Sequence, residues 1–158
     1  MIDCLFCELQ KQPKNTIFKS KLFYSQFDKF PVSPGHCEVI PKRHVVSIFD
    51  LTNLEWAELN FAIKQTIKVV ENTNLKNVYT QYLKNPLNEK MTLYCNKMVN
   101  NKNILKKPDG YNIGNNEGLA AGRTINHLHI HIIPRYLGDV DNCIGGIRNI
   151  IPGMGNYK

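Results

Sequence analysis

Three histidines alternate with branched apolar residues near the C-terminal end of this chain. The run is His127-Leu128-His129-Ile130-His131-Ile132. Successive side chains of a β-strand point to opposite faces, so this spacing predicts a strand with all three imidazoles on one face and the apolar residues packed on the other. We expect the strand to span residues 124–133 and to end at Pro134. The pattern therefore requires a fold in which a sheet is covered on one face.

Three interpretations account for such a histidine-rich strand face. A solvated surface is one, although three titratable groups at strict spacing rarely serve packing alone. A transition-metal site is another, because His-x-His is a chelating pair, but such sites usually recruit carboxylates nearby, and Arg135 follows instead of an acid. The third is nucleophilic catalysis, in which a neutral imidazole attacks phosphorus while its neighbours donate hydrogen bonds to phosphoryl oxygens. We favour this third interpretation.

Short strands are also predicted before and after the middle of the chain. Residues 15–30 mix aromatic and polar positions, which is typical of a strand or hairpin, and the turn-prone segment 31–35 follows. A short strand over residues 36–40 comes next. A further strand is expected around residues 111–115, and Gly118 and Gly122 bracket a tight connection to the last strand.

The middle of the chain predicts helices. Thr52 and Glu55 have the spacing of a capping box. Apolar residues then recur at intervals of three and four, which predicts an amphipathic helix over about residues 53–72 with these positions on its apolar side: Trp56, Leu59, Ile63, Ile67 and Val70. Residues 73–108 fit one or two further helical stretches that Asn85-Pro86 interrupts.

Composition limits the class of protein. With 158 residues, of which 42% are hydrophobic and 21% charged, the chain fits a single globular domain. No apolar run is long enough to span a bilayer and no secretory signal is visible, so we expect a cytoplasmic protein with no membrane partner. The net charge of +7 is spread as single lysines, so we expect a solvated surface and no nucleic-acid partner.

Several short sequence runs before and after the three histidines match motifs of one known family. The set resembles the histidine-triad (HIT) superfamily, covers nearly the whole chain outside residues 73–108, and follows the family's order. The C-terminal part further resembles the bacterial-type branch described as diadenosine polyphosphate hydrolases. The runs are 34–44 (Pro-Gly-His-Cys-Glu-Val-Ile-Pro-Lys-Arg-His), 114–118 (Gly-Asn-Asn-Glu-Gly), 121–122 (Ala-Gly), 127–131 (His-x-His-x-His) and 133–135 (Ile-Pro-Arg), then 138–140 (Gly-Asp-Val), 145–148 (Gly-Gly-Ile-Arg) and 151–153 (Ile-Pro-Gly).

The resemblance implies a fold and a domain organisation. The expected fold class is α+β, with an antiparallel sheet of about five strands and a long helix packed on it. Residues 1–158 are expected to form a single HIT domain with a family-specific insertion at about residues 73–108. Relatives pair across a two-fold axis through the long helix and a strand, so a homodimer is expected.

The resemblance also implies catalytic roles. His129, the central histidine, corresponds to the nucleophile, which attacks the α-phosphate and forms a nucleotidyl-histidine intermediate. His131 and His36 correspond to residues that contact phosphate oxygens, although a structural hydrogen-bonding role is the alternative for His36. The expected enzyme is a nucleotide hydrolase that cleaves dinucleoside polyphosphates or nucleoside phosphoramidate-type conjugates and releases a nucleoside monophosphate.

Further residues match the family's substrate contacts. Asn116 has the family's spacing for a ribose or phosphate contact, and Asp28 that for a ribose-hydroxyl acceptor, with a plain turn role as the alternative for Asp28. The chain departs from the family at Arg123, followed by Thr124, where Gln is frequent; a guanidinium suits a polyphosphate leaving group but leaves the substrate in doubt. An apolar wall against the base is implied, with simple core packing as its alternative: Leu5, Phe6 and Leu9.

A structural zinc site is implied by the same resemblance. Cys4 and Cys7 have ligand spacing, and zinc-bearing relatives complete the site with residues that match His44 and His127. Two thiolates and two imidazoles form a closed tetrahedral set, which stabilises the fold and leaves no position for a reactive water. If Cys4 and Cys7 are only buried thiols, His127 takes an orienting role instead. No organic cofactor is expected.

Two other functions are compatible with the sequence. A nucleotidyl transferase of the same superfamily would pass the nucleotidyl group to phosphate or a sugar phosphate. Uridylyl transferases of the family carry Gln at the third triad position, so His131 favours hydrolysis. A non-catalytic nucleotide-binding or interaction module is the alternative from another class, and the intact triad argues against it.

Overall fold

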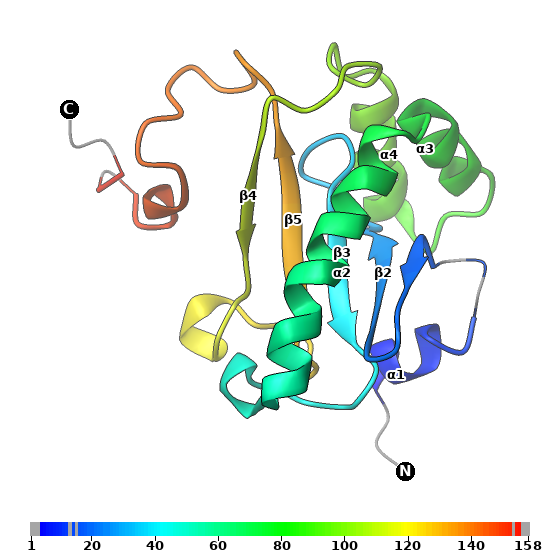
Figure 1. The fold of residues 1–158 in the computed structure, drawn as a ribbon. Helices are drawn as coiled ribbons and strands as arrows, with labels where there is room; N and C mark the ends of the chain where they lie inside the picture. Colours follow the sequence, from blue (N-terminus) through cyan, green and yellow to red (C-terminus); the bar gives the residue numbers. More distant parts are fainter. Residues whose placement is uncertain (1–3, 13, 15, 153, 156–158) are drawn as a thin grey trace.

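The computed structural model describes residues 4–12, 14, 16–152 and 154–155 and contains one five-stranded antiparallel sheet (Figure 1). The strand order is β1-β2-β3-β5-β4. Gly153 of the C-terminal run lies outside the described residues. The strands are β1 Phe18–Lys19, β2 Phe23–Phe27, β3 Cys37–Pro41, β4 Gly110–Gly114 and β5 Ile130–Arg135. The α+β fold with a five-stranded antiparallel sheet is therefore confirmed.

The last strand is shorter at its start than the sequence predicts. β5 begins at Ile130, six residues after the predicted start at Thr124, and it continues through Pro134 to Arg135. The cause is visible in the hydrogen bonds: Leu128 N–H donates to the Val45 carbonyl at 2.7 Å, which is not a ladder bond between strands. The alternation of sides nevertheless holds, because Leu128 and Ile130 both lie in the main hydrophobic core.

The long helix α2, Asn53–Glu71, covers one face of the sheet (Figure 1). It begins with the predicted capping box, in which Thr52 and Glu55 exchange hydrogen bonds. Its inward positions differ in part from the prediction, because Ala62 and Thr66 are buried whereas Trp56 is 45% exposed. The buried positions recur at intervals of three and four from Glu55 to Val70, so Trp56, one residue after Glu55, lies off this face.

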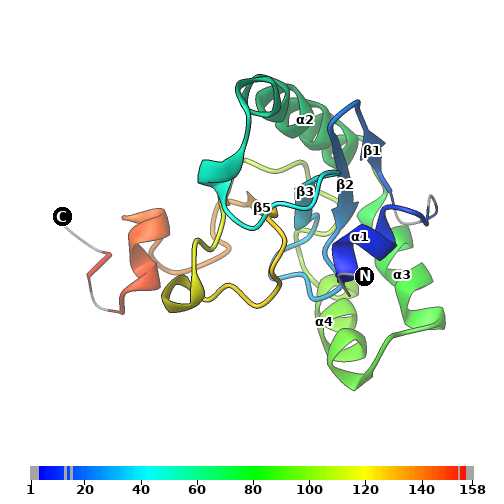
Figure 2. The ribbon, with the colours of Figure 1, turned by 90° about the horizontal axis from the view of Figure 1, so that it is seen from below.

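Residues 73–108 form two helices that pack on each other: α3, Leu75–Lys84, and α4, Glu89–Val99. Asn85 ends α3, and the Asn85-Pro86 interruption is therefore confirmed. Asn74 and Asn88 cap the two helices by accepting hydrogen bonds from backbone N–H groups. The view in Figure 2 shows α4 and the N-terminal helix α1, Leu5–Leu9, on the side of the sheet opposite α2. That this segment is an insertion into a single domain stays a prediction.

The tight turn between β2 and β3 packs against α3. Gly35 has a φ of 85°, and a Cβ at this position would lie 2.8 Å from Val70 Cγ1, so glycine is needed both for the conformation and for the space. Its N–H donates to the Tyr79 hydroxyl of α3 at 2.8 Å. The turn thereby places His36 directly before β3.

The chain leaves the sheet after β5. The C-terminal segment, with a short 3-10 helix at Gly146–Ile150, stands beside the sheet and away from α2 and α4 (Figures 1 and 2). Among the residues that the structure describes, no helix combines the length and hydropathy needed to cross a lipid bilayer.

Candidate active site

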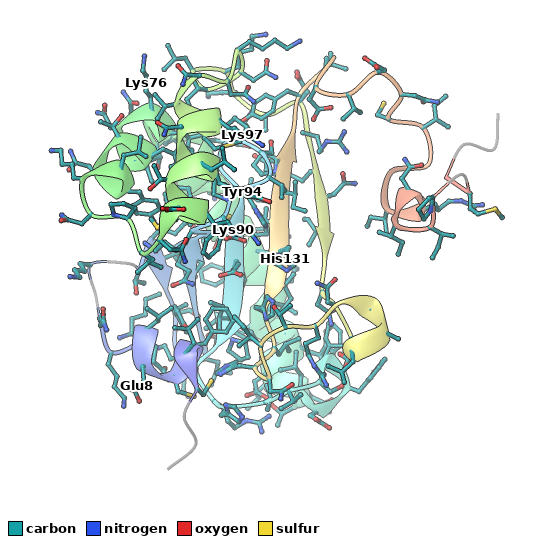
Figure 3. All side chains as sticks on the ribbon, turned by 180° about the vertical axis from the view of Figure 1, so that it is seen from behind. Glu8, Lys76, Lys90, Tyr94, Lys97 and His131 are labelled. Atoms are coloured by element: carbon teal, nitrogen blue, oxygen red, sulfur yellow. The ribbon has the colours of Figure 1, made fainter. Side chains whose placement is uncertain are left out.

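Polar side chains gather on the sheet face that α2 leaves open. The register aligns Gln26 of β2 with Glu38 of β3, and Glu38 with His131 of β5, so the three form one row across the strands. Figure 3 shows this face, with His131 on β5 and α4 bordering it. An imidazole, a carboxyl group and an amide therefore lie side by side in the middle of the sheet.

His129 is buried and is held in one orientation. The residue is only 6% exposed, and its Nδ1 lies 2.8 Å from the backbone oxygen of His127. A carbonyl oxygen only accepts, so Nδ1 carries the proton and Nε2 keeps its lone pair. The Phe6 ring packs against the imidazole with 5.1 Å between centroids. The structure thus presents the tautomer that a nucleophile requires at Nε2.

His36 and His131 form a continuous polar chain with Asp28. His36 Nε2 lies 3.1 Å from His131 Nδ1, and His36 Nδ1 lies 3.3 Å from Asp28 Oδ2. Burial lowers the pKa of His36, outweighing the opposing effect of the Asp28 carboxylate. Burial and the neighbouring His36 and His129 lower the pKa of His131 to about 4. Both imidazoles are therefore neutral near pH 7. His36 Nδ1 lies against the Asp28 carboxylate and accepts from the Val32 backbone N–H at 3.5 Å.

The Asp28 carboxylate is engaged on both of its oxygens. Oδ1 accepts from the Phe30 backbone N–H at 2.7 Å, and Oδ2 is the atom that faces His36. Each carboxylate oxygen can accept a second hydrogen bond, so the ribose contact predicted for Asp28 stays a prediction.

Glu38 is a site residue that the sequence analysis missed. It is 7% exposed and accepts a hydrogen bond from Gln26 Nε2 at 3.0 Å, and its carboxylate lies within 4.8 Å of ring nitrogens of His129 and His131. Burial and the nearby Asp28 charge raise the pKa of Glu38 to about 8. A signal was present in the sequence: Glu38 follows His36 by two residues in a strand whose other residues are mainly apolar.

A cavity of about 550 Å³ opens next to this row of polar residues. Its floor includes Gln26, Asp28 and Glu38. Residues of α1 and α3–α4 line its sides, among them the three predicted for the base wall: Leu5, Phe6 and Leu9. The volume is in the range of small-molecule sites. Leu5 and Phe6 behave differently, however: Phe6 is buried in the core, whereas Leu5 is 54% exposed.

Two cysteines and two histidines form a second cluster on the other side of His129. The Cys4 Sγ lies 3.3 Å from His127 Nδ1, and the Cys7 Sγ lies 3.4 Å from His44 Nδ1 and 3.6 Å from His127 Nδ1. The ligand atoms of all four residues lie within 4.8 Å of one another. Usual Zn–S and Zn–N bond lengths place N and S ligands of a tetrahedral ion about 3.6 Å apart, so these separations fit a zinc ion.

The second nitrogen of His127 supports the same assignment. Its Nε2 lies 2.8 Å from the Pro41 carbonyl oxygen, which fixes the proton on Nε2 and leaves Nδ1 free to bind a metal. The described residues therefore offer a closed set of four ligands with one ligand held in the correct tautomer. The sequence analysis named these four residues as candidate ligands, and in the structure their side chains lie next to one another.

The remaining predicted contacts lie in the loop before β5. Arg123 donates to the Glu117 carboxylate and to the Val46 carbonyl, both at 3.4 Å, and its Nε is buried without a partner. Asn116 Nδ2 lies 3.5 Å from the Gly122 oxygen, and Thr124 is exposed. Within the described part of the chain, no hydrogen bond joins these three residues to the triad. Their substrate roles stay predictions.

The chain is similar to proteins of one family. A model described as the HIT domain matches residues 10–138. An AP-4-A phosphorylase of Mycobacterium tuberculosis is 30% identical over 150 residues, which cover 93% of this chain and 60% of that protein. A Bis(5'-adenosyl)-triphosphatase of Dictyostelium discoideum is 30% identical over 125 residues, or 79% of this chain and 62% of that protein. This chain therefore spans about 60% of the length of these relatives.

A solved structure gives the same result for the fold. The crystal structure of a Zn-bound histidine triad family protein from Mycobacterium smegmatis has a TM-score of 0.55 and 27% sequence identity, covering 87% of this chain and 78% of that one. The matched family model spans most of the 158 residues and includes the whole triad. Together with the five-stranded sheet and its row of histidines, these similarities show that the chain belongs to the HIT family.

Proposed function

We propose that this protein is a nucleotide hydrolase that cleaves the α-phosphate linkage of dinucleoside polyphosphates or nucleoside phosphoramidate-type conjugates and releases a nucleoside monophosphate. One observation carries the proposal: the 2.8 Å contact between His129 Nδ1 and the His127 oxygen leaves a lone pair on Nε2. A buried imidazole in this tautomer is prepared for attack on phosphorus.

The reaction proceeds in two displacements. His129 Nε2 forms a bond to the α-phosphorus while the bond to the leaving group breaks, and the leaving group takes up a proton. Water then attacks the phosphorus of the nucleotidyl-histidine and loses a proton, which balances the one taken up by the leaving group, while the N–P bond breaks and free imidazole is regenerated. His36 and His131 stabilise the phosphoryl oxygens, because the charge of a bound phosphate favours protonation of this pair and hence hydrogen-bond donation.

The cavity beside the triad supports a nucleoside as the bound group. Leu5, Phe6 and Leu9 provide an apolar wall next to His129, and the base is proposed to lie against it. The names of the relatives, an AP-4-A phosphorylase and a Bis(5'-adenosyl)-triphosphatase, support dinucleoside polyphosphates as substrates. Arg123 is proposed to contact the leaving phosphates, with Asn116 and Thr124 nearby in the same loop.

A structural Zn²⁺ ion is proposed at Cys4, Cys7, His44 and His127. The separations of the ligand atoms and the tautomer of His127 support it, as does the Zn-bound relative from Mycobacterium smegmatis. The ion would stabilise the loop that carries the His127 carbonyl and would hold α1 against the sheet. With four protein ligands it has no reactive position, so it supplies stability and takes no part in the displacements.

A homodimer in the cytoplasm is proposed as the working form. Apolar side chains at and before the start of α2 and along its outer side are exposed, as expected for a surface that pairs with a second copy: Phe49, Leu54, Trp56 and Phe61. None of the five cysteines forms a disulfide, which is compatible with a reducing compartment.

Phosphorolysis is the second candidate activity. The relative named as a phosphorylase favours it, because phosphate can replace water in the second displacement without any change in the first. A non-catalytic nucleotide-binding module is a third candidate, and the buried, oriented His129 argues against it.

The test is a quenched-flow experiment with diadenosine polyphosphates and adenosine phosphoramidate, each labelled on the α-phosphate. We expect label on His129, identified by mass spectrometry, followed by release of AMP. The same reaction with added phosphate separates the candidates, because phosphorolysis yields ADP. Full turnover by His129→Ala, or the absence of any covalent intermediate during turnover, would disprove the mechanism.

A further inference from the structure

A second cavity, of about 520 Å³, lies on the other side of the triad from the cavity proposed for the base. The base cavity borders β2 and β3, whereas this second one, the β4–β5 cavity, borders β4, β5 and the C-terminal segment. The strand order β1-β2-β3-β5-β4 therefore places the triad between the two cavities. Figure 3 shows this face of the sheet, with His131 on β5 and the C-terminal segment beyond the edge strand.

The triad and the β4–β5 cavity share two strands. His131 and Ile133 lie on the same face of β5, and Ile133 lines the cavity. The two residues are about 7 Å apart along the strand. On β4, Gly114 pairs with His131, and Asn112, two residues before it, also lines the cavity. A Cβ at Gly114 would meet no atom within 4 Å, so the space beside His131 is open on this side and a chain of phosphates can pass along it.

The β4–β5 cavity has a buried polar atom without a partner in its wall. Asn103 lines the cavity and is only 2% exposed. Its Oδ1 accepts no hydrogen bond from the part of the chain that the structure describes. A buried acceptor without a donor destabilises a fold. A ligand that donates a hydrogen bond into the cavity would satisfy this atom.

The two charged side chains that line the cavity form an ion pair. Arg135 donates to the two Asp139 carboxylate oxygens at 2.7 and 2.8 Å. Its Nη1 donates to Asn112 Oδ1 at 2.7 Å, which leaves the Nδ2 group of Asn112 as a donor. A guanidinium whose groups are engaged in this way is not arranged to bind a phosphate. The cavity therefore suits a neutral group that both donates and accepts hydrogen bonds.

Resting on the proposed function, we infer that the β4–β5 cavity binds the second nucleoside of a dinucleoside polyphosphate, whose first nucleoside lies in the base cavity and whose phosphates cross the triad. Adenine presents an amino donor beside a ring-nitrogen acceptor, and these match the Asn103 oxygen and the Asn112 amide. The two cavities, of about 550 and 520 Å³, are both in the range of small-molecule sites. The site therefore favours dinucleoside polyphosphates over phosphoramidates, which have no second nucleoside.

The test compares diadenosine tetraphosphate with adenosine tetraphosphate, which has the same phosphate chain without the second adenosine. Binding is measured by calorimetry on His129→Ala protein, so that neither ligand is consumed. High salt screens the extra charge of the free terminal phosphate. We expect diadenosine tetraphosphate to bind about 10-fold more tightly, as for one or two additional hydrogen bonds. Equal affinity for the two ligands would overturn the inference.

Two cavity variants in the same background show where the second adenosine binds. Asn112→Trp fills the cavity and Asn103→Leu removes the unpaired oxygen, and each should reduce the affinity ratio to about one. AMP, which occupies only the base cavity, should bind both variants as tightly as it binds the parent protein, which controls for misfolding. Asn96→Ala, at an exposed position of α4 outside the cavity, is the matched control and should keep the ratio.

The outcomes separate this inference from the proposed hydrolase. A ratio unchanged in both cavity variants, together with hydrolysis by the wild-type protein, would keep the hydrolase and overturn the inference. Tighter binding of diadenosine tetraphosphate that both variants abolish, without turnover of any conjugate by the wild type, would disprove the hydrolase but keep the inference. No binding of either ligand would overturn both.

Discussion

The two histidine clusters of this protein use the same side chain in different surroundings. His44 and His127 face the thiols of Cys4 and Cys7, whereas His36, His129 and His131 face the carboxyl groups of Asp28 and Glu38. Sulfur ligands favour a closed metal site. Carboxyl groups beside a cavity instead orient neutral imidazoles and leave them accessible to a ligand.

One residue connects the two clusters. The His127 imidazole belongs to the cysteine cluster, but its backbone oxygen holds His129 Nδ1 at 2.8 Å. A fixed His127 therefore fixes the orientation of the proposed nucleophile. Under the proposed function, the cysteine cluster would provide rigidity and the carboxyl-flanked cluster the chemistry, so that the first serves the second.

The largest expected effect comes from replacing one histidine of each cluster by alanine and comparing the two variants. His129→Ala should lower kcat on the order of 10⁴-fold or more while zinc content and Tm stay near the wild-type values, because the chemical step alone loses its nucleophile. His127→Ala should lose zinc and stability as well as activity. Metal analysis, thermal unfolding and steady-state kinetics on both variants check this. Equal loss of zinc in the two variants would remove the division between the clusters.

Removing one thiolate should have the next largest effect. Cys7→Ser is expected to bind much less than one zinc ion per chain and to lower the Tm by roughly 10 °C, because a structural metal site contributes several kcal/mol to folding. KM should rise more than kcat falls, since α1 carries both Cys7 and the cavity residue Phe6. Cys143→Ser, at an exposed thiol outside the cluster, is the control. A Tm shift as large in the control as in Cys7→Ser would contradict the metal assignment.

The carboxyl-flanked cluster predicts a dependence of stability on pH. His131 has its pKa lowered to about 4 from 6.5, so between these values the unfolded chain binds more protons than the folded one. The free energy of unfolding should therefore rise with pH from about 4 to 6.5 and level off above that. His36, with its own lowered pKa, adds to the same slope.

His131→Gln tests this dependence. Its slope of unfolding free energy against pH, measured by urea denaturation, should be shallower than that of the wild type. The other titratable groups that surround position 131 remain in the variant: Asp28, His36, Glu38 and His129. Turnover should fall about 100-fold, because one donor to the phosphate is lost. An unchanged slope would show that His131 binds as many protons in the folded protein as in the unfolded chain, so that its pKa is not lowered by folding.

The sequence predicted the elements that have strong local signals. The capping box at Thr52 and the period of three to four that follows it gave α2 to within one residue. The start of β5 was wrong because His127 and Leu128 are held by Pro41 and Val45, which are distant in sequence, and these contacts override the strand pattern. Trp56 was misplaced because helical spacing alone does not tell a core face from an exposed apolar face.

The site was predicted as separate sets of residues, without their mutual contacts. The four thiol-cluster residues were found together because the motif supplies them together, and the structure adds the His127 tautomer. Glu38 was overlooked because a single acid in an apolar run carries no motif, and only the strand register shows that it lies between Gln26 and His131. The contact between Asp28 and His36 was not predicted, because it depends on the turn between them. The substrate contact of Asp28 stays a prediction.

The smallest expected effect comes from Phe6, an aromatic ring that contacts both clusters. Phe6 packs 5.8 Å from the His127 ring and 5.1 Å from the His129 ring and also lines the cavity. Phe6→Leu retains an apolar side chain of similar size, so we expect a loss of about 1 kcal/mol in unfolding free energy, full zinc content and a KM increase of about threefold with kcat nearly unchanged. If kcat fell as far as KM rose, the ring would be needed to hold His129 itself, and the orientation of the nucleophile would depend on packing as much as on the His127 carbonyl.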